Sequence, residues 1–138
     1  MATTVFAHRN RHRFEVAAAR LVAVGLALGT AWIHAWLGGT LFVLNAAGYT
    51  ALAVALVAPL PSPLRDARWL VRLALLGFTV ATIVGWAAFG ARFWVAYLDK
   101  AIELALVAAV SVDIWLSDGG PLGVARRIRR VGAARTRG

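Results

Sequence analysis

Three ionisable residues, Asp99, Lys100 and Glu103, lie inside one hydrophobic run that extends from residue 93 to 116. A helix rises about 1.5 Å per residue, so about 20 residues cross a hydrocarbon layer of about 30 Å, and this run is long enough to span it. Charged groups at that depth are costly and usually face protein or water instead of lipid. On a helix, Asp99 and Glu103 are four residues apart and Lys100 and Glu103 are three apart, so these side chains can meet. The run therefore predicts a buried polar cluster.

Two roles suit this cluster. From the helical rise, Glu103 lies about 16 Å beyond Arg92, near the middle of a membrane. His34 and Asn45, on the first two hydrophobic runs, are placed to add hydrogen bonds. The cluster is then either a site that handles protons or ions, or a structural ion pair that fixes this helix against the first two. Because small membrane bundles use polar clusters to hold helices together, we favour the structural role.

The residue types needed for most other chemistry are missing. The chain has no cysteine, which excludes disulfides, thiolate nucleophiles and cysteine-bound metal clusters. His34 is the only histidine within the hydrophobic runs, so one chain cannot supply the two membrane histidines of a b-type haem. No paired His/Glu spacing, glycine-rich phosphate loop or nucleophile elbow occurs. We therefore expect no enzyme activity, no cofactor and no bound metal.

Four hydrophobic runs should position the cluster. The chain is 61% hydrophobic, above the roughly 45–50% of soluble domains. Gly38 and Gly39 permit a tight turn after the first run, and Gly90 marks a second turn. Gly25 and Gly29 make a small-residue face that we expect to pack inside the bundle. The sequence predicts an all-α fold, an integral membrane four-helix bundle of two tight helical hairpins (14–118), with spans at about 16–37, 40–58, 69–89 and 93–116.

The net charge of the chain is +9, and the positions of its basic residues indicate a membrane topology. Basic residues crowd an N-terminal arm (1–13), the connection between the second and third runs, and a C-terminal tail (119–138), whereas the opposite side has only Arg92. This asymmetry predicts a multi-pass plasma-membrane protein with both termini in the cytoplasm, and no nucleic-acid binding. Near the cytoplasmic end, we expect Asp113 to form an ion pair with Arg68 or Arg72. The tail arginines expected to contact anionic headgroups of the inner leaflet are Arg126, Arg127, Arg129 and Arg130.

Three features carry a resemblance to a protein group: His34-Ala35-Trp36, the stretch from Leu41 to Ala46, and Lys100 with Glu103. With them, residues 16–117 resemble small four-helix membrane proteins of unassigned function from high-GC actinobacteria. That resemblance implies the fold but no activity.

Two functions follow from these observations. The first is a non-enzymatic accessory or interaction subunit of the plasma membrane, whose partners are membrane lipids and either further copies of itself or a larger membrane complex. The alternative is a homo-oligomeric ion- or proton-coupled transporter or channel that uses the intramembrane Asp/Lys/Glu cluster.

Overall fold

A computed structural model describes residues 2–59, 61–62 and 67–135, and this part of the chain is helical throughout apart from its turns and connections. Helices formed at all four hydrophobic runs, with boundaries within two residues of those predicted except at the start of the first. The five helices are α1 (Ala2–Leu37), α2 (Thr40–Val57), α4 (Arg68–Phe89), α5 (Trp94–Asp118) and α6 (Gly120–Arg135). The prediction of an all-α fold is confirmed.

Glycines close the first hairpin, as predicted. Gly38 and Gly39 have φ angles of 68° and 86°, which lie in the left-handed region that favours glycine. The second hairpin turns differently, because Gly90 has φ −77° and the backbone stays extended until α5 begins. There the Trp86 indole donates a hydrogen bond to the Ala91 carbonyl oxygen at 3.0 Å, which fastens the turn to α4.

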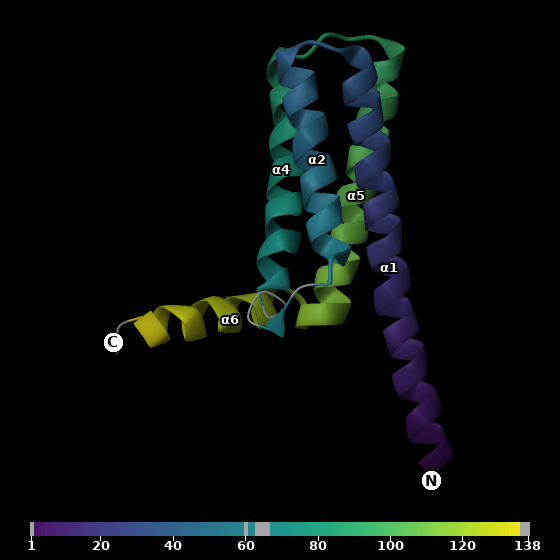
Figure 1. Cartoon of the computed structure of the whole chain (residues 1–138), viewed down its shortest axis with the longest axis vertical. Coiled ribbons are helices and arrows are strands. Elements are labelled where there is room, and N and C mark those ends of the chain that lie inside the picture. The colour runs from purple at the N-terminus through teal and green to yellow at the C-terminus, as the bar shows by residue number, and fades with distance from the viewer. Residues whose placement is uncertain (1, 60, 63–66, 136–138) are drawn as a thin grey trace.

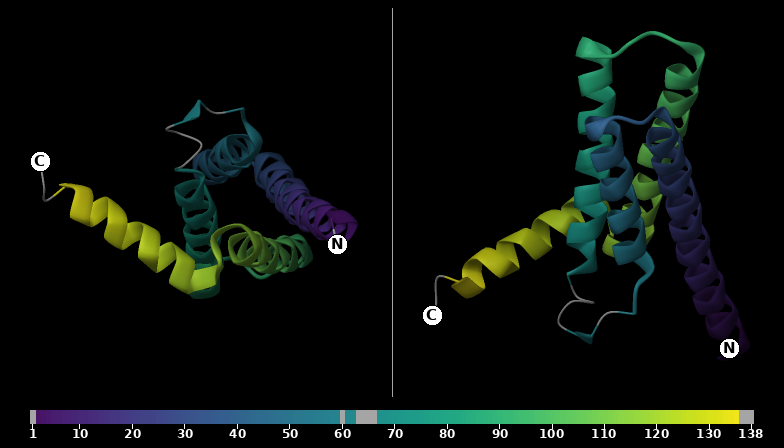
Figure 2. Two further views of the ribbon diagram at one scale, coloured as in Figure 1. Left: turned by 90° about the horizontal axis from the view of Figure 1, so that it is seen from below. Right: turned by 45° about the horizontal axis from the view of Figure 1, so that its top comes forward.

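The four long helices α1, α2, α4 and α5 form a bundle in which each packs against two neighbours (Figures 1 and 2). α1 lies between α2 and α5, and α4 lies between the same two helices on the other side. When the end with the two hairpin turns is brought forward, the α1–α2 hairpin stands apart from the α4–α5 hairpin (Figure 2). The bundle therefore consists of two hairpins that diverge towards their turns.

Small side chains let α1 approach its neighbours. Ala23, Ala27 and Ala31 are buried and recur every four residues, so they form one stripe along the helix. The expectation that Gly25 packs inside the bundle is wrong, because it is exposed and a Cβ at that position would touch nothing within 4 Å. The glycines lie on a neighbouring face of the helix, which the local sequence pattern did not reveal. Larger side chains that fill the core opposite this stripe are Tyr49, Leu56, Leu75, Leu106 and Val110.

Helices at both ends of the chain extend beyond the hydrophobic runs. The predicted arm (1–13) is not a separate element, because α1 runs without a break from Ala2 into the bundle. At the other end, the predicted tail (119–138) contains α6, which lies across the axis of the bundle (Figure 1). Gly119 and Gly120 have φ angles of 74° and 72°, and these two left-handed residues turn the chain from α5 into α6.

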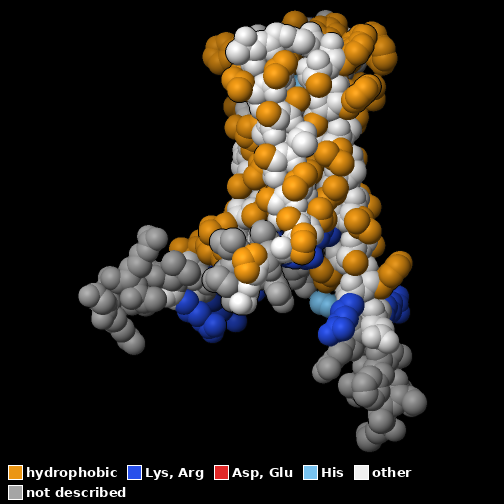
Figure 3. Space-filling view, viewed as in Figure 1, with side chains coloured by type: hydrophobic (Ala, Val, Ile, Leu, Met, Phe, Trp, Pro, Cys, Tyr) orange, Lys and Arg blue, Asp and Glu red, His pale blue; other side chains and the backbone are white. Residues whose placement is uncertain are grey.

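The surface of the bundle is apolar. Hydrophobic side chains cover the face shown in Figure 3, where Lys and Arg side chains gather at the end that carries the termini. Among the helices of the described residues, three are long and apolar enough to cross a membrane, namely the part of α1 from Asn10, α2 and α4. α5 is also long enough, but its charged residues set its composition apart from that of these three helices.

Candidate functional site

The charged residues of α5 lie on its buried face. Asp99, Lys100, Glu103 and Asp113 occupy the same stripe as Leu106, and all of them contact the interior of the bundle. This follows from the 3.6-residue period, which places positions three and four apart on one side of a helix. α5 thus has its charges on the inside, together with apolar side chains such as Leu106 and Val110, and large apolar side chains on the outside.

Asp99 receives contacts from two residues of α1. Thr30 Oγ1 donates a hydrogen bond to Asp99 Oδ1, and His34 Nδ1 lies 3.6 Å from the same oxygen. His34 Nδ1 is also 2.9 Å from the Thr30 carbonyl oxygen. Since a carbonyl oxygen can only accept, Nδ1 carries the hydrogen in the neutral ring, and Nε2 is left as an acceptor. The α1–α5 contact is therefore partly polar.

Lys100 joins the two buried carboxylates. Its Nζ lies 3.0 Å from Asp99 Oδ2 and 2.6 Å from Glu103 Oε2. The second oxygen of Glu103, Oε1, accepts hydrogen bonds from the Tyr49 hydroxyl at 2.9 Å and the Thr82 hydroxyl at 3.0 Å. Tyr49 belongs to α2 and Thr82 to α4, so Glu103 links three helices. We call the set Thr30, His34, Tyr49, Thr82, Asp99, Lys100 and Glu103 the outer network.

The outer network has the donor types of a metal site, but a lysine holds the central position. His34, Asp99 and Glu103 each offer a ligand atom, and these atoms lie within 4.8 Å of one another. Because the Lys100 ammonium contacts both carboxylates directly, a metal ion would have to displace it. The arrangement as it stands is an ion pair with one positive and two negative groups.

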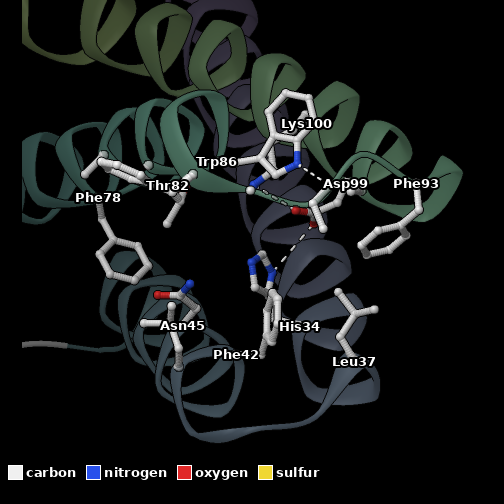
Figure 4. A pocket seen from close by; sticks show the side chains of 17 residues that line it. His34, Leu37, Phe42, Asn45, Phe78, Thr82, Trp86, Phe93, Asp99 and Lys100 are labelled. Carbon is white, nitrogen blue, oxygen red and sulfur yellow. Dashed lines mark hydrogen bonds and ion pairs between the residues drawn. The ribbon is translucent and has the colours of Figure 1, made fainter.

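Asn45 lies apart from this network. Its side chain, half buried on α2, makes no hydrogen bond to the described residues and instead lines a cavity beside the network (Figure 4). The expectation that Asn45 bonds to the cluster is therefore wrong, because its position on α2 directs the amide into open space between the hairpins.

The cavity has a volume of about 500 Å³ and lies where the two hairpins diverge. Its polar floor is formed by His34, Asp99 and Lys100, with Asn45 and Thr82 beside them (Figure 4). Hydrophobic side chains from both hairpins make the walls and the mouth, among them Leu37, Leu41, Phe42, Phe78, Phe89 and Phe93. The site is an apolar pocket over a charged floor, the usual character of a small-molecule site.

A second ionic cluster lies at the other end of the bundle. Arg72 Nε donates to Asp113 Oδ2 at 2.9 Å, and Arg72 Nη1 donates to Asp118 Oδ2 at 2.8 Å. Asp113 also accepts from the Ser117 hydroxyl at 2.8 Å and lies 3.6 Å from Arg20 Nη2. The structure thus brings together Asp113 and Arg72. We call the set Arg20, Arg72, Asp113, Ser117 and Asp118 the inner network.

The other predicted arginines lie around the inner network. Arg68 donates to the Ala58 carbonyl oxygen at 2.7 Å, which ties α4 to the end of α2. Arg127 Nη2 lies 3.2 Å from Asp118 Oδ1 and so joins α6 to α5. Three further arginines of α6 are exposed to solvent, namely Arg126, Arg129 and Arg130.

An apolar layer separates the two networks. Glu103 and Asp113 are ten residues apart on α5, about 15 Å along its axis. Between them α5 presents Leu106 and Val110 to the interior, and Leu75 of α4 is buried in the same core. No described polar side chain bridges this layer, so the outer network is in contact with one end of the bundle only.

Sequence reasoning found the members of α5 and missed several of their partners. Asp118 is not among the predicted site residues, although its side chain is 1% exposed and bonded to Arg72. Thr30 was not considered, since a lone threonine in an apolar run carries no signal of its own. No family model, curated protein or solved structure matches this chain, so the resemblance to actinobacterial membrane proteins stays a prediction.

Proposed function

We propose that the chain is a multi-pass plasma-membrane protein in which α1, α2, α4 and α5 all span the bilayer. The sidedness of α5 supports its inclusion, because its charges face the bundle and its outward side chains are apolar. With 25 residues it measures about 37 Å, enough to cross. The large hydrophobic side chains exposed on α5 are Trp94, Tyr97, Leu98, Leu104, Val112 and Trp115. Exposure of an apolar surface of this extent to water would be unfavourable, whereas its contact with lipid is favourable.

Both termini are cytoplasmic in this proposal. The support is the concentration of arginines at the end with the termini, against Arg92 alone among the described residues at the end with the turns. Since the chain has no cysteine, the orientation is testable with single substitutions. A membrane-impermeant maleimide should label Ala91→Cys in intact cells and Pro61→Cys only after permeabilisation. The reverse pattern would invert the topology.

The protein acts as a non-enzymatic binding subunit, and the pocket over the outer network carries this conclusion. Its volume of about 500 Å³ suits a small molecule, and its polar groups converge on one side of an apolar chamber. Neither carboxylate is a free base, because Lys100 bonds to both and Tyr49 holds Glu103 as well. A site with its charges already paired orients and retains a ligand more readily than it transfers a proton.

Conduction by a single chain is disfavoured by the apolar layer. An ion that reached Glu103 from the pocket would still face about 15 Å of apolar core before Asp113. Crossing that layer without polar partners would cost several kcal/mol. The competing transporter therefore requires a path between copies, whereas binding requires only the pocket already described.

A matched pair of glycine substitutions on α4 tests the pocket. Gly85 lines it and Gly77 does not, and a Cβ at either position would touch nothing within 4 Å. Gly85→Leu should fill the chamber while Gly77→Leu adds the same side chain elsewhere on the helix. Saturation-transfer NMR with tert-butylbenzene, using protein in nanodiscs and empty nanodiscs as the lipid background, measures occupancy. Binding should fall only in Gly85→Leu, and equal signals from all three proteins would remove the pocket from the function.

The second contact in this proposal is with anionic lipid. α6 lies across the bundle at the cytoplasmic end, with Arg126, Arg129 and Arg130 exposed along it. A basic helix in this position can rest on an anionic leaflet, at about 1 kcal/mol per basic residue. Replacing these three arginines by glutamine should reduce the phosphatidylglycerol that co-purifies with the protein, and an unchanged lipid content would exclude this contact.

A further inference from the structure

The outer network carries an unbalanced negative charge. Asp99 and Glu103 supply two negative charges and Lys100 one positive charge, while His34 is counted as neutral. Within a hydrocarbon-spanning bundle the effective dielectric constant is low, so a net charge is felt over several ångströms and is costly to leave uncompensated. A positively charged group in the adjoining pocket would lower that cost.

The side of the network that faces the pocket still has acceptor capacity. Asp99 lines the pocket and receives Thr30 on one oxygen and Lys100 on the other, yet a carboxylate has about four lone-pair sites. His34 also lines the pocket and has an acceptor nitrogen, Nε2, left over from its bond to the Thr30 carbonyl. Lys100 is engaged by both carboxylates, at 3.0 and 2.6 Å. The floor therefore offers more acceptors than donors.

Aromatic rings stand above this floor. Phe42, Phe78, Phe89 and Phe93 line the pocket from two helices, α2 and α4, and from the second turn. The face of an aromatic ring attracts a cation, and the attraction grows when the cation is desolvated. Trp86, another wall residue, already holds a cation in this way, with the Arg92 guanidinium 4.4 Å from its ring centroid. The walls and the floor thus favour the same sign of ligand charge.

We propose that the pocket binds an organic cation, a molecule with an ammonium head near Asp99 and an apolar or aromatic body against the phenylalanines. This inference rests on the proposed binding function of the pocket and adds the ligand class. The volume of about 500 Å³ holds a head group together with a ring-sized body. Residues at both hairpin turns line the pocket, so it lies at the end of the bundle that is non-cytoplasmic in the proposed topology.

Three probes of similar shape separate charge from size. Phenyltrimethylammonium is the cation, tert-butylbenzene is its neutral isostere, and benzenesulfonate is the anion. Binding to the full chain in nanodiscs is measured by saturation-transfer NMR, with empty nanodiscs subtracted. The cation should bind at least about tenfold more tightly than the neutral isostere, and the anion most weakly.

Two variants test the source of this preference. Asp99→Asn removes the excess charge, so the cation should lose about tenfold in affinity while tert-butylbenzene is unaffected. Asn45→Asp adds a negative charge to a pocket residue that has no hydrogen bond to lose, and cation affinity should rise. This second variant decides the matter if Asp99→Asn does not fold.

The outcomes distinguish the two proposals. If the cation and its neutral isostere bind equally in the wild-type chain, the ligand class is wrong and the binding pocket stands. Tighter binding of the anion, or no effect of Asn45→Asp, likewise overturns the ligand class. If no probe binds, both proposals fall together.

Discussion

Removing the Lys100 ammonium should destabilise the bundle, because two buried carboxylates would lose the cation that they share. In Lys100→Met, the Asp99 and Glu103 carboxylates would lose the cation that lies 3.0 and 2.6 Å from them, and the charge of the outer network would change from −1 to −2. Breaking a buried ion pair from one side costs about 3–5 kcal/mol, because an uncompensated charge stays buried. We expect a loss of unfolding free energy of that size.

The double variant Lys100→Met/Glu103→Gln isolates the cause. It restores the network charge to −1, and the oxygen of glutamine can still accept from Tyr49 and Thr82. Since replacing both partners of a buried pair is often close to neutral, most of the lost stability should return. Unfolding is followed by circular dichroism in mixed micelles as the fraction of dodecyl sulfate increases.

The matched control is Leu104→Met, which introduces the same side chain at an outward-facing position on α5. Leu104 is 59% exposed, so this change should stay within about 0.5 kcal/mol of the wild type. If Lys100→Met also stays within about 1 kcal/mol, the ammonium does not stabilise the bundle as a buried ion pair. A double variant as unstable as the single one would refute the charge argument in the same way.

Three further changes test other contacts with the same unfolding measurement. Tyr49→Phe removes a donor to Glu103 and should cost about 1–3 kcal/mol, with retained stability arguing that Thr82 alone satisfies the carboxylate. Gly48→Ala should destabilise by about 1–3 kcal/mol because its Cβ would lie 2.7 Å from Phe78 Cζ, whereas Gly25→Ala meets nothing and serves as the control. Arg72→Met leaves Asp113 and Asp118 without their shared partner and should cost about 3–5 kcal/mol. Arg126→Met, a change at an exposed arginine, is the control and should be neutral. Equal stability of the two variants would show that the inner network does not stabilise the bundle.

The sequence of α5 alone was enough to predict a buried cluster, because the charged residues of that cluster are close together along one helix. Asp99, Lys100 and Glu103 are three or four residues apart on one helix, and helical geometry alone brings them together. Their partners on other helices depend on how far each helix is rotated about its own axis. That rotation follows from packing over the whole bundle, which is why Thr30 was missed and Asn45 was placed in the wrong surroundings.

The stripe of small residues shows the same limit. Gly25 and Gly29 satisfy a small-residue pattern, but so do Ala23, Ala27 and Ala31 two positions away. Glycine would allow the closest approach of a neighbouring helix, yet it is the alanine stripe that faces α2 and α5. The pocket was equally invisible in the sequence, because it arises from the divergence of two hairpins and not from any one segment.

The two networks differ in a way that suggests a division of labour along α5. In the inner network and its immediate surroundings, three arginines (Arg20, Arg72 and Arg127) outnumber Asp113 and Asp118, and these residues connect α1, α4, α5 and α6. In the outer network, negative charges outnumber Lys100 and an open pocket adjoins the excess. In the proposed topology the excess of arginine lies beside the inner leaflet and suits anchoring, since anionic headgroups can balance it. The excess negative charge of the outer network lies beside an apolar chamber and has no such lipid partner. A cationic ligand bound in the pocket would compensate this charge.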